Sequence, residues 1–307
     1  MTRVSTSGNY GVMTSNLMLA QVRQNQIGEQ VSSQKVASDL KGYSKNAEML
    51  TAMKSAQAKI DGFLDQTKLV SNRLEMQDMG IERLANSATS AREAIANALA
   101  AGNATTLMQQ LQNAFGDAVQ GLNTKANGYY VFSGAKNDTA TTTATSMADL
   151  TAAPSTASLF QNDQYVTTNR IDESTTVSTG VLGDALGTDL FDAFKQVQAY
   201  VDANGPFTGN LTDAQSTFLK GLLPSFDAAH KDLVTAQGKN GLNQKRFEDA
   251  QVSLQDQSDS LTVMIGGVVD VDMAEAVTRL QAAQLAVQAS AQVFASLQNS
   301  SLLNVLK

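Results

Sequence analysis

The stretch MKSAQAKIDGFLDQTKLVSNRLEMQDMGIERLANSATSAREAIANA, residues 53–98, carries the pattern that decides the fold. Positions in it that are spaced alternately by three and four residues are almost all apolar, and only Thr67 and Gln77 interrupt the series. The series is Met53, Ala56, Ile60, Phe63, Thr67, Val70, Leu74, Gln77, Ile81, Leu84, Ala88, Ala91, Ile95 and Ala98. A seven-residue repeat held over this length predicts one long helix that winds left-handed around a partner helix.

Similar series lie on both sides of this stretch. Near the start of the chain, residues 13–31 show the spacing, and the segment around Gly42 interrupts it. Toward the end, residues 247–264 show it again, and we expect Gly266-Gly267 to end that helix. Residues 211–265 are therefore expected to form the second long helix, which starts near Leu211 or Pro224.

The last helix has a clear predicted beginning. In DVDMAE (residues 270–275), Asp272 suits an N-cap, and Glu275 three residues later completes a capping box. The apolar series that follows is shifted by two residues from the preceding one, so two separate helices are expected to meet at residues 266–272.

The middle of the chain has a different character. AGNATT (101–106) predicts a turn, a helix is expected over 107–126, and Asn127-Gly128 favours positive φ before an aromatic run that begins a β region. From 137 to about 187 the chain is rich in Thr, Ala, Ser and Asp, which we interpret as a small β-rich domain of hairpins and loops, with disorder as the alternative. Helix is expected again at 189–202, before the turn cluster NGPFTGN.

These elements predict a mainly α fold: a long antiparallel helical rod, like a coiled-coil bundle, with a small β-rich domain inserted at its far end. We expect five parts, in which two terminal helices flank two long-helix arms and the insertion. Their expected bounds are 1–44, 45–136, 137–200, 201–268 and 269–307.

Charge and composition exclude several classes of function. Residues 137–194 hold eight acids and one base, and the remainder of the chain balances, which argues against binding to nucleic acid. The chain has no cysteine, the first residues lack the apolar segment of a cleaved signal peptide, and no run of 18 apolar residues predicts a membrane span.

No catalytic, cofactor-binding or metal-binding residues are predicted. His230 is the only histidine and cannot build a zinc site without cysteine. The acids of DVDMAE lack the spacing of a calcium loop, and GVLGDALG (180–187) fits no phosphate-binding motif.

The end of the chain is unusual because no charged residue lies between Arg279 and Lys307. A helix whose faces are small and neutral suits burial on several sides, so we expect both chain ends to pack against other copies and to become ordered on assembly. The predicted assembly seam consists of Met13, Leu17, Ala20, Ile27, Val31, Met273, Val277, Leu280, Val287, Ala291, Phe294, Leu302 and Val305.

Residues 270–307 resemble the C-terminal signature of the bacterial flagellin superfamily, in which an acidic turn precedes a Gln/Ala/Leu helix and a Ser-Leu-Leu close. NGYYVFSGAKNDT (127–139) is similar to the stretch that marks the hook-filament junction branch, also called hook-associated protein three. SNLMLAQVRQNQIGEQVSSQKV (15–36) also resembles the first helix of the superfamily, although the usual Gly-Lys and Asp-Pro-type loop does not follow.

The resemblance implies a structural, non-enzymatic subunit of the flagellum that leaves the cell through the type III export apparatus. Its implied partners are further copies of itself in a ring or helical lattice, a neighbouring hook-associated protein, flagellin and an export chaperone, with neither nucleic acid nor membrane. The implied location is extracellular.

Three other functions remain open. A flagellin-type filament subunit is the alternative within the superfamily. A secreted enzyme with coiled-coil arms would need a catalytic centre in residues 137–194, where no nucleophile and base pair is recognisable. A phage-tail or adhesin fibre would form a parallel trimer.

Overall fold

The computed structural model describes the backbone of residues 3–305 and side chains between Tyr10 and Ser296. The chain divides into two compact units. We call residues 61–256 the central unit, and the segments up to residue 60 and from residue 257 the terminal unit. Each unit is described by itself.

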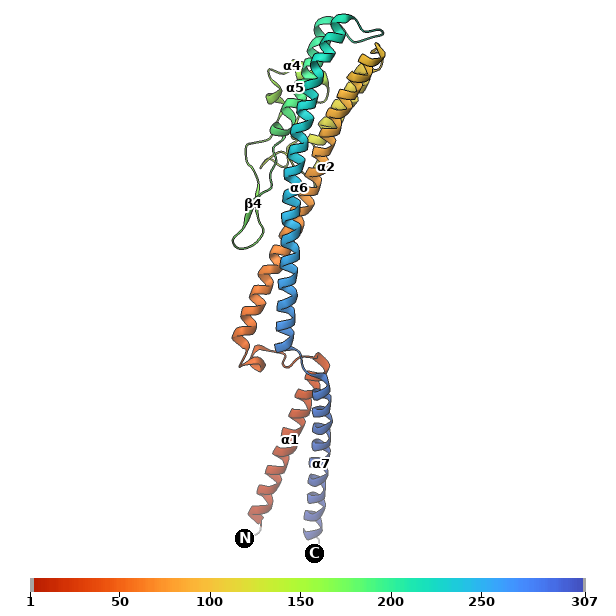
Figure 1. The fold of residues 1–307 in the computed structure, drawn as a ribbon. Helices are drawn as coiled ribbons and strands as arrows, with labels where there is room; N and C mark the ends of the chain where they lie inside the picture. Colours follow the sequence, from red (N-terminus) through yellow and green to blue (C-terminus); the bar gives the residue numbers. More distant parts are fainter. Residues whose placement is uncertain (1–2, 306–307) are drawn as a thin grey trace. The chain divides into compact units, whose positions relative to one another are not determined.

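Helices dominate the described residues (Figure 1). The α-helices are α1 (Arg3–Ser33), α2 (Ala47–Ala101), α3 (Leu107–Leu122), α4 (Met147–Ala152), α5 (Gly183–Asn204), α6 (Asp213–Val269) and α7 (Met273–Val305). Two short 3-10 helices are also present: η1 (Leu40–Tyr43) lies between α1 and α2, and η2 (Thr156–Leu159) follows α4. The strands form two antiparallel pairs, β1 (Lys125–Ala126) with β2 (Tyr129–Tyr130) and β3 (Thr168–Arg170) with β4 (Thr176–Ser178). The predicted mainly α fold with a small β part is confirmed.

In the central unit, α2 and α6 run antiparallel along each other. Gln251 donates to Ser71 Oγ at 3.0 Å, whereas further along α2 the Arg92 guanidinium contacts Asp227 Oδ1 at 2.5 Å. Asn103 beyond the end of α2 pairs with Asn210 just before α6. The residue numbers of the contacting positions therefore decrease along α6 as they increase along α2, which shows that the two helices are antiparallel. The long heptad series predicts such a helix pair.

The main core of the central unit joins five helices, α2, α3, α4, α5 and α6. Aromatic rings at its centre contact each other edge-on or tilted, with Phe115 5.2 Å from Phe191 and Phe194 5.1 Å from Phe226 between ring centroids. Such pairs stabilise a core by roughly 0.5–1.5 kcal/mol beyond the area they bury. Few aromatic residues thus suffice, because they are concentrated at one place.

A second, smaller cluster lies beside the main core. We call it the hairpin cluster: Val70 and Leu74 of α2, Phe247 of α6, and Ile171 and Val177 of the β3–β4 hairpin.

Two buried amides lie in the same part of α2 and α6. Gln77 Nε2 donates to Val131 O at 3.4 Å, and Asn240 Nδ2 donates to Leu74 O at 2.9 Å. Arg73 also donates to Val131 O, and burial lowers the pKa of its guanidinium. The oxygens Gln77 Oε1 and Asn240 Oδ1 are buried without a partner among the described residues. We call Arg73, Gln77 and Asn240 the polar layer.

The turn at Asn127-Gly128 has the predicted geometry. Asn127 has φ 51° and Gly128 has φ 87°, as a two-residue hairpin with a type I′ turn requires. The predicted helix over 107–126 is too long, because it ends at Leu122 and the chain then pairs Lys125 with Tyr130. Phe132, four residues beyond the turn, is fully buried in the main core.

Two further helix bounds differ from the prediction. α5 begins at Gly183, before the predicted start at residue 189. Its first part packs closely on its neighbours, because a Cβ at Gly187 would lie 2.8 Å from the Phe160 ring. The prediction that Gly266-Gly267 ends the long helix is wrong. α6 continues to Val269, and Asp270 N still donates to Gly266 O at 2.8 Å. A glycine inside a helix costs only about 1 kcal/mol, which the long helix tolerates.

The acidic segment 137–194 satisfies its carboxylates with neutral donors. Backbone N–H groups of Thr145, Ala135 and Ser174 are the main causes that lower the pKa of Asp149, Asp163 and Asp172 respectively, the last to about 2. The side chains of Asn162 and Gln164 donate to Asp184 at 3.0 and 2.7 Å. Neutral donors thus hold Asp149, Asp163 and Asp172 ionised, and these contacts bring no positive charge to the acidic segment.

Candidate assembly surface

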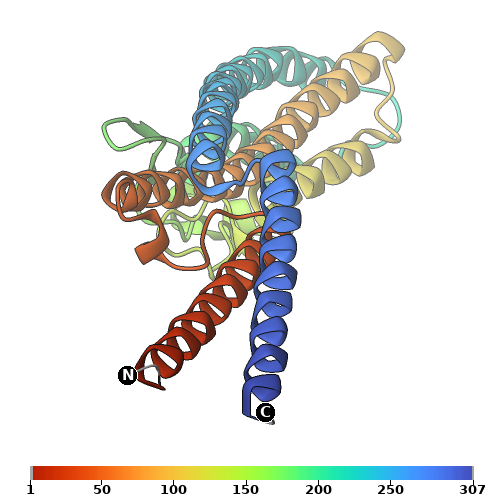
Figure 2. The same cartoon turned by 90° about the horizontal axis from the view of Figure 1, so that it is seen from below.

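In the terminal unit, α1 and α7 lie side by side and run antiparallel (Figures 1 and 2). The ring centroids of Tyr10 and Phe294 are 6.2 Å apart at one end of the pair, and a Cβ at Gly28 would meet Leu280 Cδ1 at 4.0 Å near the other. Beyond that end, Val36 N donates to Val269 O at 2.8 Å and Val271 N donates to Gln34 O at 3.1 Å. Backbone hydrogen bonds therefore connect the segment that follows α1 to the segment that precedes α7.

The seam residues predicted in α1 share one face of that helix. Met13, Leu17, Ala20, Ile27 and Val31 are all partly buried, with exposed residues between them. The helix in extensive contact with α1 is α7. These positions therefore face the partner helix of the same chain.

In α7 the face that packs is turned relative to the predicted seam. The least exposed positions are Ala276, Leu280, Ala283, Val287, Ser290 and Phe294, which we call the packing face of α7. It shares Leu280, Val287 and Phe294 with the predicted seam, whereas Met273, Val277 and Ala291 are exposed. At 100° per residue the two faces differ by about 50°. Small Ala276, Ala283 and Ser290 permit close contact, which a pattern weighted toward large apolar residues overlooks.

Leu302 and Val305, the two remaining seam residues, lie outside the part of the chain whose side chains the structure describes.

Apolar side chains also point away from the helix pair. In α1, Val12 and Met18 are each 60% exposed, and Leu19 and Val22 are about half exposed. Their helical phase places them on the side of α1 opposite its seam positions. In α7, Leu285 is 65% exposed and lies opposite the packing face. The seven-residue pattern did not predict this outer face. The sequence signal that could have indicated it is the presence of large apolar residues outside the repeat.

Charge is scarce on this pair. Between Tyr10 and Ser33 the charged residues are Arg23 and Glu29, and between Met273 and Ser296 they are Glu275 and Arg279. Arg279 Nε donates to Glu275 Oε1 at 3.1 Å, so this ion pair lies within one helix. A free surface helix usually carries more charge, so these faces suit contact with another protein.

A shallow groove of about 520 Å³ follows one side of the α1–α7 pair. Its residues are mostly small or apolar: Asn16, Leu19, Ala20, Arg23, Ile27, Arg279, Ala282, Ala283, Ala286 and Ser290. The three alanines of α7 lower the helix surface there, so another helix could approach closely.

The start of α7 is capped at Asp272. Its Oδ1 accepts hydrogen bonds from Ala274 N at 2.9 Å and Glu275 N at 3.1 Å. The Glu275 carboxylate accepts a hydrogen bond from Arg279 instead of the Asp272 backbone N–H. Only the Asp272 half of the predicted capping box is therefore formed. A side-chain cap of this kind stabilises a helix by about 1 kcal/mol.

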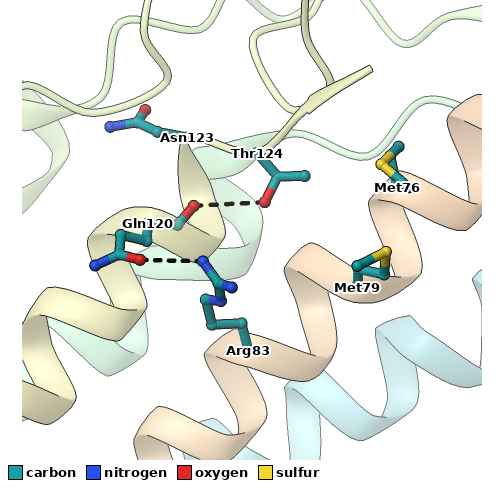
Figure 3. A pocket seen from close by; sticks show the side chains of 6 residues that line it. All are labelled: Met76, Met79, Arg83, Gln120, Asn123 and Thr124. Carbon is teal, nitrogen blue, oxygen red and sulfur yellow. Dashed lines mark hydrogen bonds between the residues drawn. The ribbon is translucent and has the colours of Figure 1, made fainter. Parts of the chain in front are cut away.

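The central unit has a separate pocket of about 410 Å³ between α2 and the end of α3 (Figure 3). Met76 and Met79 form one wall, and Arg83 donates to Gln120 Oε1 at 3.1 Å on the other. Asn123 is held by hydrogen bonds to the Thr142 backbone. The Arg83, Gln120 and Asn123 side chains are thus engaged in hydrogen bonds, and the six lining residues include no nucleophile and base pair.

Within the described part of the chain, no three potential metal ligands gather at one place. His230 lies with Nδ1 3.3 Å from both Ala85 O and Thr89 Oγ1, so it bridges α6 and α2 in the central unit. The described helices include none that is long and apolar enough to cross a membrane.

Comparison with known proteins places these features in context. Residues 223–306 match the bacterial flagellin C-terminal helical region. The comparison with curated proteins gave no match.

Two solved structures share the fold. A Vibrio parahaemolyticus protein described as flagellar hook-associated has a TM-score of 0.59 at 12% identity, over 76% of this chain and 99% of that one. FlgL of Bacillus cereus has a TM-score of 0.55 at 16% identity, over 70% of this chain and 99% of that one. The chain thus contains a segment that matches the flagellin C-terminal helical region, and its fold is similar to that of these two solved structures.

Proposed function

We propose that this protein is a non-enzymatic structural subunit of the bacterial flagellum, and specifically the subunit of the hook-filament junction. The flagellin C-terminal region and the fold shared with FlgL of Bacillus cereus support a flagellar subunit. The NGYYVFSG stretch, which resembles the junction branch, favours the junction over the filament.

The observation that carries the proposal is the outer face of the α1–α7 pair. Full burial of a Val, Leu or Met side chain contributes roughly 1.5–3 kcal/mol. Five outer residues, Val12, Met18, Leu19, Val22 and Leu285, remain half exposed or more. Burying that remainder contributes about 4–8 kcal/mol, while association costs about 4–15 kcal/mol. One contact is therefore marginal, and several simultaneous contacts in a lattice are needed.

In this proposal the α1–α7 pairs of successive copies pack into a ring or helical lattice outside the cell. A head-to-tail contact between the groove and the outer face gives a ring where the rotation between copies closes, and an open helix where it does not. One end of the lattice contacts a neighbouring hook-associated protein and the other accepts flagellin. An export chaperone would cover the apolar face before secretion by the type III route.

Deletion of the gene tests the junction role. We expect intact hooks, no filaments and secretion of unpolymerised flagellin. Complementation with Leu285→Asp should fail in the same way, because a carboxylate would enter the packed lattice. Gln66→Asp, on an exposed position of α2, is the matched control and should restore filaments. Normal filaments in the deletion strain would refute the proposal.

A flagellin-type filament subunit is the second candidate, because residues 223–306 match the flagellin C-terminal region. The purified protein separates the two. A filament subunit would grow into micrometre filaments by itself, whereas a junction subunit would stop at short assemblies. Absence of any filament protein in the deletion strain, secreted or assembled, would also favour this candidate.

A further inference from the structure

The β3–β4 hairpin of the central unit holds itself together. Thr168 pairs with Ser178 and Arg170 with Thr176. At the tip, Asp172 Oδ1 accepts hydrogen bonds from the N–H groups of Ser174 and Thr175, both at 2.7 Å. The hairpin conformation therefore depends on contacts within residues 168–178.

Its attachment to the helices is small. Ile171 and Val177 are its two buried side chains, and they pack on Val70, Leu74 and Phe247. Beside them, Asn243 Nδ2 of α6 donates to Ser178 O at 2.9 Å. Two apolar anchors on a segment of eleven residues are few compared with the main core, in which each helix contributes several buried residues.

The hairpin cluster is also separate from the main core. The two form distinct groups of buried residues, and neighbouring positions of α2 and α6 carry the polar layer with its two unpartnered oxygens. Loss of the hairpin anchors therefore does not remove a side chain from the main core. Local openings of low free energy occur where buried apolar contacts are few.

The base of the hairpin is a tight neck. Thr167 O accepts from both Thr179 N and Gly180 N at 2.9 Å, and a Cβ at Gly180 would lie 2.4 Å from Thr167 N. Asn169 Nδ2 donates to Thr179 Oγ1 at 2.6 Å. These bonds keep the two strands together when the hairpin moves as one body.

We propose that the β3–β4 hairpin is a strap that opens about this neck while the main core stays folded. Opening uncovers Val70, Leu74 and Phe247, which form an apolar strip on α2 and α6. This inference does not depend on the flagellar role.

The absence of cysteine from the chain makes single-thiol labelling a direct test. Three full-length variants each carry one buried thiol: Val177→Cys on the strap, Leu74→Cys beneath it, and Ala88→Cys in the main core as the matched control. Labelling by a soluble disulfide reagent is followed without denaturant, and circular dichroism checks that each variant is folded.

We expect the thiols at 177 and 74 to be labelled at similar rates, each at least about 100-fold faster than the thiol at 88. Equal labelling at 177 and 88, or slow labelling at 74 beside fast labelling at 177, would overturn the proposal.

Discussion

Replacement of Gln77 by methionine should stabilise the central unit. Gln77 is fully buried, its Nε2 makes one long hydrogen bond of 3.4 Å to Val131 O, and its Oε1 has no partner among the described residues. Rotating the amide does not help, because the oxygen would then face the Val131 carbonyl. The orphaned oxygen therefore carries its desolvation penalty in the folded state, about 1–3 kcal/mol.

The magnitude follows from what methionine removes and keeps. It has nearly the same length and flexibility as glutamine, so little volume is lost. The long hydrogen bond contributes at most about 0.5 kcal/mol, and Val131 O still accepts from Arg73 at 3.3 Å. The net gain expected for Gln77→Met is therefore about 1–2 kcal/mol.

Urea unfolding followed by circular dichroism measures this change as a rise in the midpoint without a change in slope. Gln66→Met, on an exposed position of the same helix, is the control. It should change the free energy of unfolding by less than about 0.5 kcal/mol. A lower midpoint for Gln77→Met than for the unmodified chain would refute the reasoning, because the buried glutamine would then stabilise the folded state.

Three other predictions concern the ends of the chain and the strap. The pKa of Asp172 is lowered to about 2 from 3.8, so its contribution to the hairpin turn is present above about pH 4 and is lost as the pH falls toward 2; the protection of the Thr175 amide, measured against its intrinsic exchange rate at each pH, should fall over that range, and Asp172→Ala should remove the dependence. Asp272→Ala should destabilise the start of α7 by about 1 kcal/mol, seen as faster exchange at the Ala274 amide, whereas Asp272→Asn should retain the cap. In dilute solution the amides of α1 and α7 should exchange faster than those of α2 and become protected on assembly, so strong protection in a dilute monomer would contradict the need for neighbouring copies.

Sequence patterns predicted the elements whose signals are local. The heptad series in residues 53–98 gave one helix because twelve of its fourteen positions are apolar, and Asn127-Gly128 gave a positive-φ turn because few other residues adopt that geometry. The seam in α1 was predicted because Leu17 and Ile27 are large and regularly spaced.

Features that depend on distant contacts were not predictable in this way. The packing face of α7 includes Ala276 and Ser290, whose value is their small size against α1, and no pattern within α7 shows that. Gly266 failed to end α6 because pairing of Val269 with Val36 fixes the helix end. The hairpin cluster joins residues as far apart in the chain as Val70 and Phe247, so it could be identified only from the three-dimensional structure.

The antiparallel contact of α1 with α7 also sets an order of events in biosynthesis. Val31 and Met273, at the near ends of the two helices, are separated by about 240 residues, which a ribosome adds in about 12–50 s. Throughout that time α1 has no helix to pair with, since its companion does not yet exist. Closing such a long loop carries a large entropic cost, so this docking should be among the last steps of folding.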